Sequence, residues 1–152
     1  MRTPLQQFFQ SDLAIISAVA SLKLLLHLAA IPGYGYFRDE LYYFACTEHL
    51  AWGYVDQPPF SIFILWLWRS LFGEGIFALR LLPALCGVAT VVLTGLMVRD
   101  LNGNGGGKKT AVFVATLAVL IAPVYLAMNA FYSMNSFDIL FWTLAEYLIV
   151  RI

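Results

Sequence analysis

Charged residues are scarce in this sequence: they make up 12% of the 152 residues, whereas apolar residues make up 61%. A soluble domain needs far more charge to cover its surface, so this composition excludes an ordinary soluble globular protein. Acidic and basic residues balance to a formal net charge of zero, and no basic stripe is present that would neutralise phosphates. The sequence therefore gives no indication of a nucleic acid partner.

Cysteine is also scarce, with Cys46 among polar residues and Cys86 inside an apolar run. Two cysteines in such different surroundings do not make a disulfide framework, and we expect both to be small buried side chains. No cluster of cysteine and histidine has the spacing of a zinc site. The glycine-rich stretch 102–107 is not a phosphate-binding loop, because Lys108 stands where the second glycine of that motif belongs and no strand precedes it.

Long apolar runs are what the sequence does contain, and its mean hydropathy is +0.79. A helix needs about 20 residues to span the hydrocarbon core of a bilayer. The sequence predicts an all-α polytopic membrane helical bundle with about four transmembrane helices, over residues 13–31, 76–98, 110–128 and 134–152. The first helix is an uncleaved anchor in this interpretation, because its apolar run is long for a signal peptide and Pro32-Gly33 is a poor cleavage context.

The apolar stretch 59–72 is too short to span, and the charges of the loops indicate where it lies. If it does not cross, Arg2, Lys108 and Lys109 fall on one side of the membrane and the acidic segment 38–48 falls on the other, as the positive-inside rule requires. We therefore expect an N-terminus in the cytoplasm, an inner loop over 99–109 and an outer loop over 32–75. That outer loop should carry two interfacial helices, over about 39–52 and 59–72.

Three carboxylates are expected on the outer face: Asp39 and Glu40 shortly after the first helix, and Asp138 after the turn 131–137. An acid at this depth could take a proton from a hydroxyl and still be reached by a lipid-borne substrate. The alternative for Asp39 and Glu40 is a pair of first-turn acids that complement a helix dipole. For Asp138 the alternative is a helix-start acid with Ser136 as the cap.

The basic residues near the outer face also have two possible interpretations. Arg80, one turn into the second helix, and Arg38, beside the acids, could bind a phosphate at the interface or could simply reach toward water. Lys23 and His27 share one face of the first helix, and Glu146 lies deep in the fourth. We interpret these three as structural groups that face the interior of the bundle, where they could pair.

Four ordered motifs give the sequence a family resemblance. They are Tyr36-Phe37-Arg38-Asp39-Glu40-Leu41-Tyr42-Tyr43, His49-Leu50-Ala51-Trp52-Gly53-Tyr54-Val55-Asp56-Gln57-Pro58-Pro59, Ala78-Leu79-Arg80-Leu81-Leu82-Pro83 and Tyr132-Ser133-Met134-Asn135-Ser136-Phe137-Asp138. Together they resemble the bacterial glycosyltransferase 39 family, of the dolichyl-phosphate-mannose protein mannosyltransferase type, which is related to the aminoarabinose transferase of lipid A. The resemblance extends over nearly the whole chain.

This resemblance implies a membrane enzyme of the GT-C type, in the plasma (inner) membrane of a bacterium. Such an enzyme moves a sugar from a polyprenyl-phosphate carrier to a lipid, glycan or protein acceptor on the outer face, with inversion at the anomeric carbon. It implies catalytic roles for Asp39, Glu40 and Asp138, and substrate contacts by Arg80, Arg38, Tyr54 and Gln57. No cofactor is certain from the sequence, and a divalent metal is possible.

Members of that family are several times longer, so we expect the chain to be an N-terminal fragment that is inactive alone. Two other interpretations remain open at this stage. The chain could be a non-catalytic membrane subunit or transporter fragment whose acids bind a cation or a proton, or it could be a degenerate remnant without activity. Transporter acids usually lie near the midplane of the bilayer, whereas Asp39 and Asp138 are expected at its outer boundary.

Overall fold

The computed structural model describes residues 11–102 and 108–152, and within these ranges the chain forms helices and loops without a strand. The helices in chain order are α2 (Asp12–Ala30), the short 3-10 helix η1 (Ile31–Gly33), α3 (Arg38–Thr47), α4 (Pro59–Phe72), α5 (Ile76–Leu101), α6 (Lys108–Ile121), α7 (Pro123–Met128) and α8 (Met134–Val150). The prediction of an all-α membrane helical bundle is confirmed.

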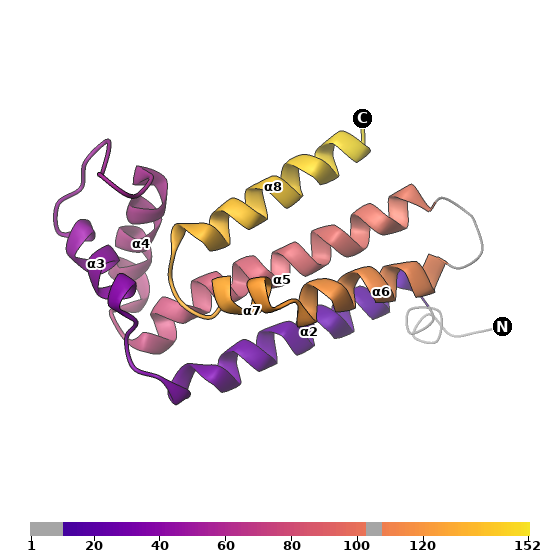
Figure 1. Ribbon diagram of the computed structural model, residues 1–152, viewed down its shortest axis with the longest axis horizontal. Helices are drawn as coiled ribbons and strands as arrows, with labels where there is room; N and C mark the ends of the chain where they lie inside the picture. The colour runs from indigo at the N-terminus through magenta and orange to yellow at the C-terminus, as the bar shows by residue number, and fades with distance from the viewer. Residues whose placement is uncertain (1–10, 103–107) are drawn as a thin grey trace.

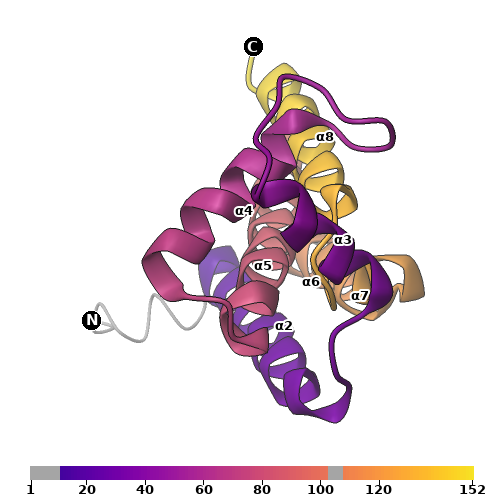
Figure 2. The same ribbon diagram turned by 90° about the vertical axis from the view of Figure 1, so that its left-hand side faces the viewer.

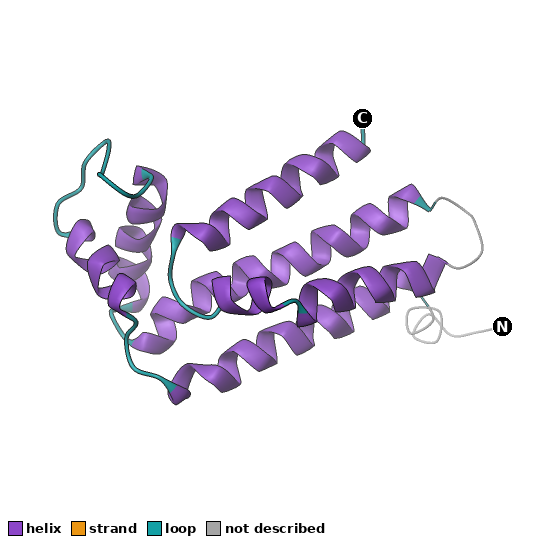
Figure 3. Ribbon diagram, in the orientation of Figure 1, coloured by secondary structure: helices purple, strands orange, loops and turns teal. Residues whose placement is uncertain are grey.

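The long helices lie side by side, with α5 packed against α2, α6 and α8 (Figure 1). Helices α3 and α4 gather at one end of this bundle, and α4 runs across the direction of the long helices (Figure 2). The described loops from α2 to α5, and the loop between α7 and α8, lie at the end of the bundle that carries α3 and α4 (Figure 3). The position of residues 59–72 along the membrane surface stays a prediction of the sequence.

Two helical segments are long and apolar enough to cross a bilayer, Asp12–Gly33 and Ile76–Leu101. The predicted third span over 110–128 is wrong as a single helix, because the chain breaks at Ala122 between α6 and α7. Ala122 adopts an extended conformation, with ψ of 125°, directly before Pro123. A residue before proline is disfavoured in the helical region, and proline has no N–H to continue the ladder.

The predicted interfacial helices have different outcomes. Helix α4 has the predicted bounds, beginning with Pro59 at its first position and ending at Gly73, whose φ is +79°. The other prediction, a helix over 39–52, is too long, because α3 ends at Thr47 and the chain turns into a loop. Helix α8 begins at Met134 as expected and ends at Val150.

Two apolar clusters hold the helices together. One lies among the long helices and contains Val19, Ala20, Val91, Val119 and Leu120. The other joins α3 and α4 to the bundle and contains Tyr43, Cys46, Ile62, Leu65, Leu79, Cys86, Tyr132 and Phe137. Both cysteines are buried and free, as predicted. The second cluster packs α3 and α4 against α5 and α8.

The ionisable residues inside the bundle behave in two ways. Lys23 is completely buried and its Nζ donates to the carbonyl of Tyr125, 3.1 Å away, in α7, while the Nδ1 atom of buried His27 lies 2.9 Å from the carbonyl oxygen of Lys23. Their interior position is confirmed. For Glu146 the prediction of an interior position is wrong, because this residue is exposed on α8, as is Trp142 on the same helix.

Candidate active site at the end of the bundle

The carboxylates of the first motif lie in the first turn of α3, where acids complement the helix dipole. Phe37, the N-cap residue, is extended, and its N–H donates to the Oε2 atom of Glu40 at 2.8 Å. This bond satisfies one of the backbone donors that a helix start leaves free. Glu40 thus has the helix-start role that the sequence left open, and it has further partners as well.

Glu40 is completely buried and forms an ion pair with Arg80 of α5. The Nη2 atom of Arg80 lies 2.9 Å from Oε2 of Glu40, and Nε lies 3.1 Å from Oε1. The backbone N–H of Tyr132, in the turn before α8, also donates to Oε1, at 2.9 Å. One carboxylate therefore joins α3, α5 and the turn before α8, and a buried charge with this many partners is well compensated.

The other N–H groups of Arg80 donate to backbone carbonyls in the segment between α2 and α3. Nη1 donates to the carbonyls of Ile31 and Tyr34, at 3.4 and 2.9 Å, and Nη2 donates to the carbonyl of Gly35 at 2.6 Å. With the two bonds to Glu40, all five N–H groups of the guanidinium have acceptors within the protein. In this structure Arg80 holds the segment between α2 and α3 to α5, and all its donors are used within the protein. The contact to a lipid phosphate that the family resemblance implied stays a prediction.

Asp39 differs from its neighbour because its side chain is 44% exposed. Its ion-pair partner is the adjacent Arg38, 3.1 Å away, whose side chain is 90% exposed. Surface pairs of this kind contribute little to stability and do not block the carboxylate. Of the two acids in the first motif, Asp39 is the one that is exposed to solvent.

Tyr43 connects the helix of Asp39 with the helix of Asp138. It lies one turn after Asp39 on α3, is buried, and its hydroxyl accepts a hydrogen bond from the backbone N–H of Met134 at 2.9 Å. Burial raises the pKa of the Tyr43 phenol, the Met134 N–H lowers it, and the nearby Asp39 carboxylate raises it further. Asp138 lies one turn after Met134, so this hydrogen bond holds the start of α8 next to α3.

Asp138 lines a cavity of about 380 Å³. The cavity is formed by the start of α4 and the start of α8, and its lining residues are Pro58, Phe60, Ser61, Met134, Asn135, Phe137, Asp138 and Phe141. The alternative that Asp138 is a helix-start acid capped by Ser136 is wrong, because α8 begins at Met134 with Ser133 at its N-cap position. The Ser136 hydroxyl instead donates to the carbonyl of Met128 at 2.6 Å.

A second, apolar cavity of about 550 Å³ adjoins the first, and Phe60 lines both. Its other lining residues come from the loop after α3 and from α4, and they are Leu50, Ala51, Trp52, Pro59 and Phe63. Trp52 is fully exposed in the described structure. The two cavities together form a surface that is apolar on one side and carries a carboxylate on the other.

The residues predicted from the second motif lie in the loop that borders these cavities. The Tyr54 hydroxyl accepts from the N–H of Ala51 and donates to the carbonyl of His49, both at 2.9 Å, so it closes the loop on itself. Gln57 is 8% exposed, and its Oε1 atom is buried without a hydrogen-bond partner in the described chain. Gln57 precedes Pro58, which lines the cavity of Asp138.

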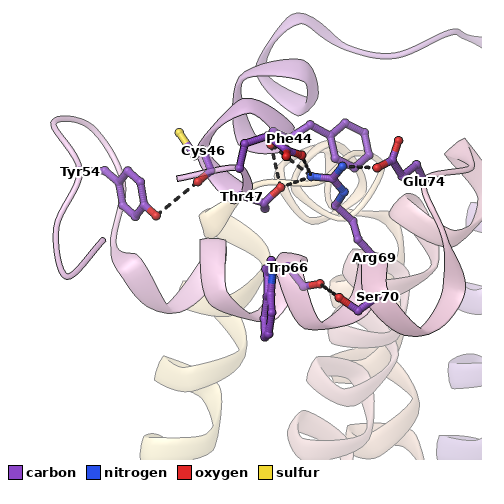
Figure 4. A network of polar contacts seen from close by, with 9 residues as sticks. Phe44, Cys46, Thr47, Tyr54, Trp66, Arg69, Ser70 and Glu74 are labelled. Atoms are coloured by element: carbon purple, nitrogen blue, oxygen red, sulfur yellow. Dashed lines mark hydrogen bonds and ion pairs between the residues drawn. The ribbon is translucent and has the colours of Figure 1, made fainter. Parts of the chain in front are cut away.

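Sequence reasoning missed two residues that hold this region together, Tyr43 and Arg69. Figure 4 shows Arg69 of α4 donating to the carbonyl of Phe44 at 3.3 Å and to the Thr47 hydroxyl at the end of α3, and forming an ion pair with Glu74. It also pairs with Glu48 at 2.8 Å. In the sequence, Arg69 is the single charged residue of the apolar stretch 59–72, which could have indicated that it has a specific partner. The available signal for Tyr43 was its spacing of four residues from Asp39.

Metal binding was left possible by the sequence. Within residues 11–102 and 108–152, no three side chains of histidine, cysteine, aspartate or glutamate gather in a way that could hold an ion.

The fold and the site define a class: a helical membrane protein with an exposed carboxylate, a cavity and an apolar surface at one end of its bundle. A family model described as dolichyl-phosphate-mannose-protein mannosyltransferase matches residues 56–152. The chain belongs to this family of membrane glycosyltransferases, as the four motifs predicted. The match includes Gln57, Arg80 and Asp138, while Asp39 and Glu40 precede it. No curated protein and no solved structure matches the chain.

Proposed function

We propose that this protein belongs to the machinery that transfers a sugar from a polyprenyl-phosphate carrier to an acceptor hydroxyl on the outer face of a membrane. The observation that carries the proposal is the contrast between two neighbouring carboxylates. Glu40 is buried and fully bonded to Arg80 and to the backbone, whereas Asp39 is exposed. A rigid support beneath an accessible acid is the arrangement that acid–base chemistry needs.

In this proposal Asp39 is the general base. Its carboxylate takes the proton of the acceptor hydroxyl while the hydroxyl oxygen attacks the anomeric carbon of the donor. The bond between that carbon and the phosphate oxygen breaks, and its electron pair leaves with the lipid phosphate. A single displacement of this kind inverts the configuration at the anomeric carbon. Asp138, on the cavity wall, orients the sugar or the acceptor as the bond changes.

Glu40 and Arg80 act through Asp39 and are positioning residues in the proposal. The ion pair fixes the first turn of α3 to α5, and the Tyr132 N–H fixes the turn before α8 to the same carboxylate. The apolar cavity beside the site supports a donor with a lipid chain, since its lining is almost entirely apolar.

The test is Asp39→Asn in the full-length protein, in membranes from cells that express it, with polyprenyl-phosphate mannose as the donor. Loss of a general base lowers transfer about 10²–10⁴-fold. Glu146→Gln is the matched control, because it makes the same chemical change at an exposed position on α8 and should leave transfer unchanged. Full transfer by the Asp39→Asn protein would show that Asp39 only begins a helix. Proton or cation uptake without transfer would favour the transporter interpretation instead.

A further inference from the structure

The cavity beside Asp138 has a composition unlike that of its apolar neighbour. Its lining combines three phenylalanine side chains, Phe60, Phe137 and Phe141, with three polar residues, Ser61, Asn135 and Asp138. Its volume of about 380 Å³ is at the small end of the range for small-molecule sites, roughly 300–1,000 Å³. A cavity of this size suits one small ring better than an extended chain.

The Phe60 ring packs edge to face against each of the other two rings. The ring centroids of Phe60 and Phe141 are 5.4 Å apart and those of Phe60 and Phe137 are 5.9 Å apart. Phe137 is buried, while Phe60 and Phe141 are each 47% exposed. The two exposed rings therefore offer apolar surface. The C–H groups on one side of a pyranose ring pack well on such a surface.

The polar groups of this cavity suit hydroxyl ligands. An ionised aspartate accepts hydrogen bonds, and an asparagine side chain both accepts and donates. Asn135 and Asp138 are three residues apart on α8, so they lie on neighbouring positions of one helix face. Gln57 precedes the cavity-lining Pro58 in the chain, and its buried Oε1 lacks a partner in the described structure.

We propose that this cavity is the subsite for a single sugar ring of the lipid-linked donor. Phe60 and Phe141 contact the C–H face of the ring, and Asn135 and Asp138 bind its hydroxyls. This inference rests on the proposed function in taking the bound ring as the one that is transferred. A lipid chain would have no use for Asn135 and Asp138, and the adjoining apolar cavity is the place where such a chain meets no carboxylate.

The experiment measures binding to the protein in lipid nanodiscs, so it does not depend on turnover. The probes are sugar-free polyprenyl phosphate and the same lipid carrying mannose, glucose, galactose or aminoarabinose. At least one sugar-bearing lipid should bind more tightly than the sugar-free lipid. Asn135→Ala should weaken binding of that lipid about tenfold, the equivalent of one hydrogen bond, and leave binding of the sugar-free lipid unchanged. Phe141→Leu should act in the same direction.

Phe113→Leu is the control, because Phe113 is an exposed phenylalanine on α6. It should change neither affinity. The inference is overturned if no sugar increases affinity, if Asn135→Ala and Phe141→Leu leave the discrimination intact, or if they weaken both kinds of lipid equally. Asp39-dependent transfer with intact discrimination in Asn135→Ala would overturn the subsite alone. Discrimination that Asn135→Ala abolishes, in a protein that never transfers sugar, would overturn only the proposed function.

Discussion

At the scale of single residues, adjacent positions in one motif have opposite environments. Glu40 is completely buried and Asp39 is nearly half exposed, although both are acids in the first turn of α3. The difference follows from geometry, because successive residues of a helix point about 100° apart. Glu40 faces α5 and meets Arg80, and Asp39 faces away from it. A substitution at either position should therefore affect a different property.

Arg80→Ala should destabilise the protein strongly. Removing one partner of a buried ion pair leaves an uncompensated charge, at a cost of about 3–5 kcal/mol. The expected result is a large drop in melting temperature in detergent micelles, with loss of transfer as a consequence. Arg38→Ala removes the same charge at an exposed position and should change stability by less than about 0.5 kcal/mol. Equal melting temperatures for Arg80→Ala and the unmodified protein would show that the Glu40–Arg80 ion pair is not needed to hold α3 to α5.

At the scale of elements, α3 and α4 are short helices that depend on their contacts. Isolated helices of fewer than about 12–15 residues are marginal in water, and α3 has 10 residues. Its start is held by the Glu40–Arg80 pair, and its end is held by Arg69, which reaches the carbonyl of Phe44 and the side chain of Thr47. Asp39, the proposed general base, lies on α3. The contacts at the two ends of this helix therefore determine where the Asp39 carboxylate lies.

Arg69→Ala should loosen the end of α3 and leave the bundle intact. Partial burial lowers the pKa of Arg69, but its bonds to Glu74 and Glu48 more than compensate, so the guanidinium is always charged and the network persists through neutral pH. The expected result is faster amide hydrogen exchange over residues 44–58, with unchanged exchange in α5. Ser70→Ala is the control, because that hydroxyl bonds only within α4, to the carbonyl of Trp66 (Figure 4). Unchanged exchange in Arg69→Ala would mean that apolar packing alone fixes α3.

At the scale of the whole molecule, close packing of the long helices sets the geometry of the end that carries the site. Gly95 of α5 lies so near α2 that an added Cβ would meet Cγ1 of Ile16 at 2.5 Å, and it would also approach Thr116 of α6. Small residues allow membrane helices to approach in this way. Gly87, nearer the site, has a similar relation to Lys23 and Asn129.

Gly95→Ala should therefore destabilise the bundle by about 1–3 kcal/mol, because the added methyl group overpacks the contact between α2 and α5. The measurement is thermal or denaturant unfolding in detergent micelles. The matched control is Gly75→Ala, since a Cβ at Gly75 would meet nothing within 4 Å and its φ is negative. If the two variants unfolded alike, the helices would have room to separate.

The orientation in the membrane gives a second prediction at this scale. Single cysteines at positions 39 and 138, introduced with Cys46 and Cys86 replaced by serine, should both react with a membrane-impermeant reagent added outside the cell. Lys109→Cys should react only after the membrane is opened, because the loop before α6 is expected inside. Labelling of positions 39 and 138 from opposite sides of the membrane would contradict a shared site on the outer face.

Much of the architecture followed from the sequence, because apolar runs and prolines act locally. The bounds of α4 follow from Pro59 and Gly73, and the long span of α5 follows from its apolar length. The break at Ala122 was predictable in principle from Pro123, yet Pro83 lies inside α5 without ending it. Proline alone therefore does not decide whether a membrane helix continues.

The sequence by itself determined the helical membrane class, the family and the presence of acids at the predicted outer face, because these depend on composition, run length and motif order. Tertiary structure alone decided which acid is free and which is bonded. In the tertiary structure Arg80 forms an ion pair with Glu40, and Glu146 is exposed. The Tyr43 hydroxyl accepts a hydrogen bond from the N–H of Met134, 91 positions further along the chain. Such contacts depend on how helices that are distant in the sequence pack together, and the sequence near one residue does not indicate which distant residue it will contact.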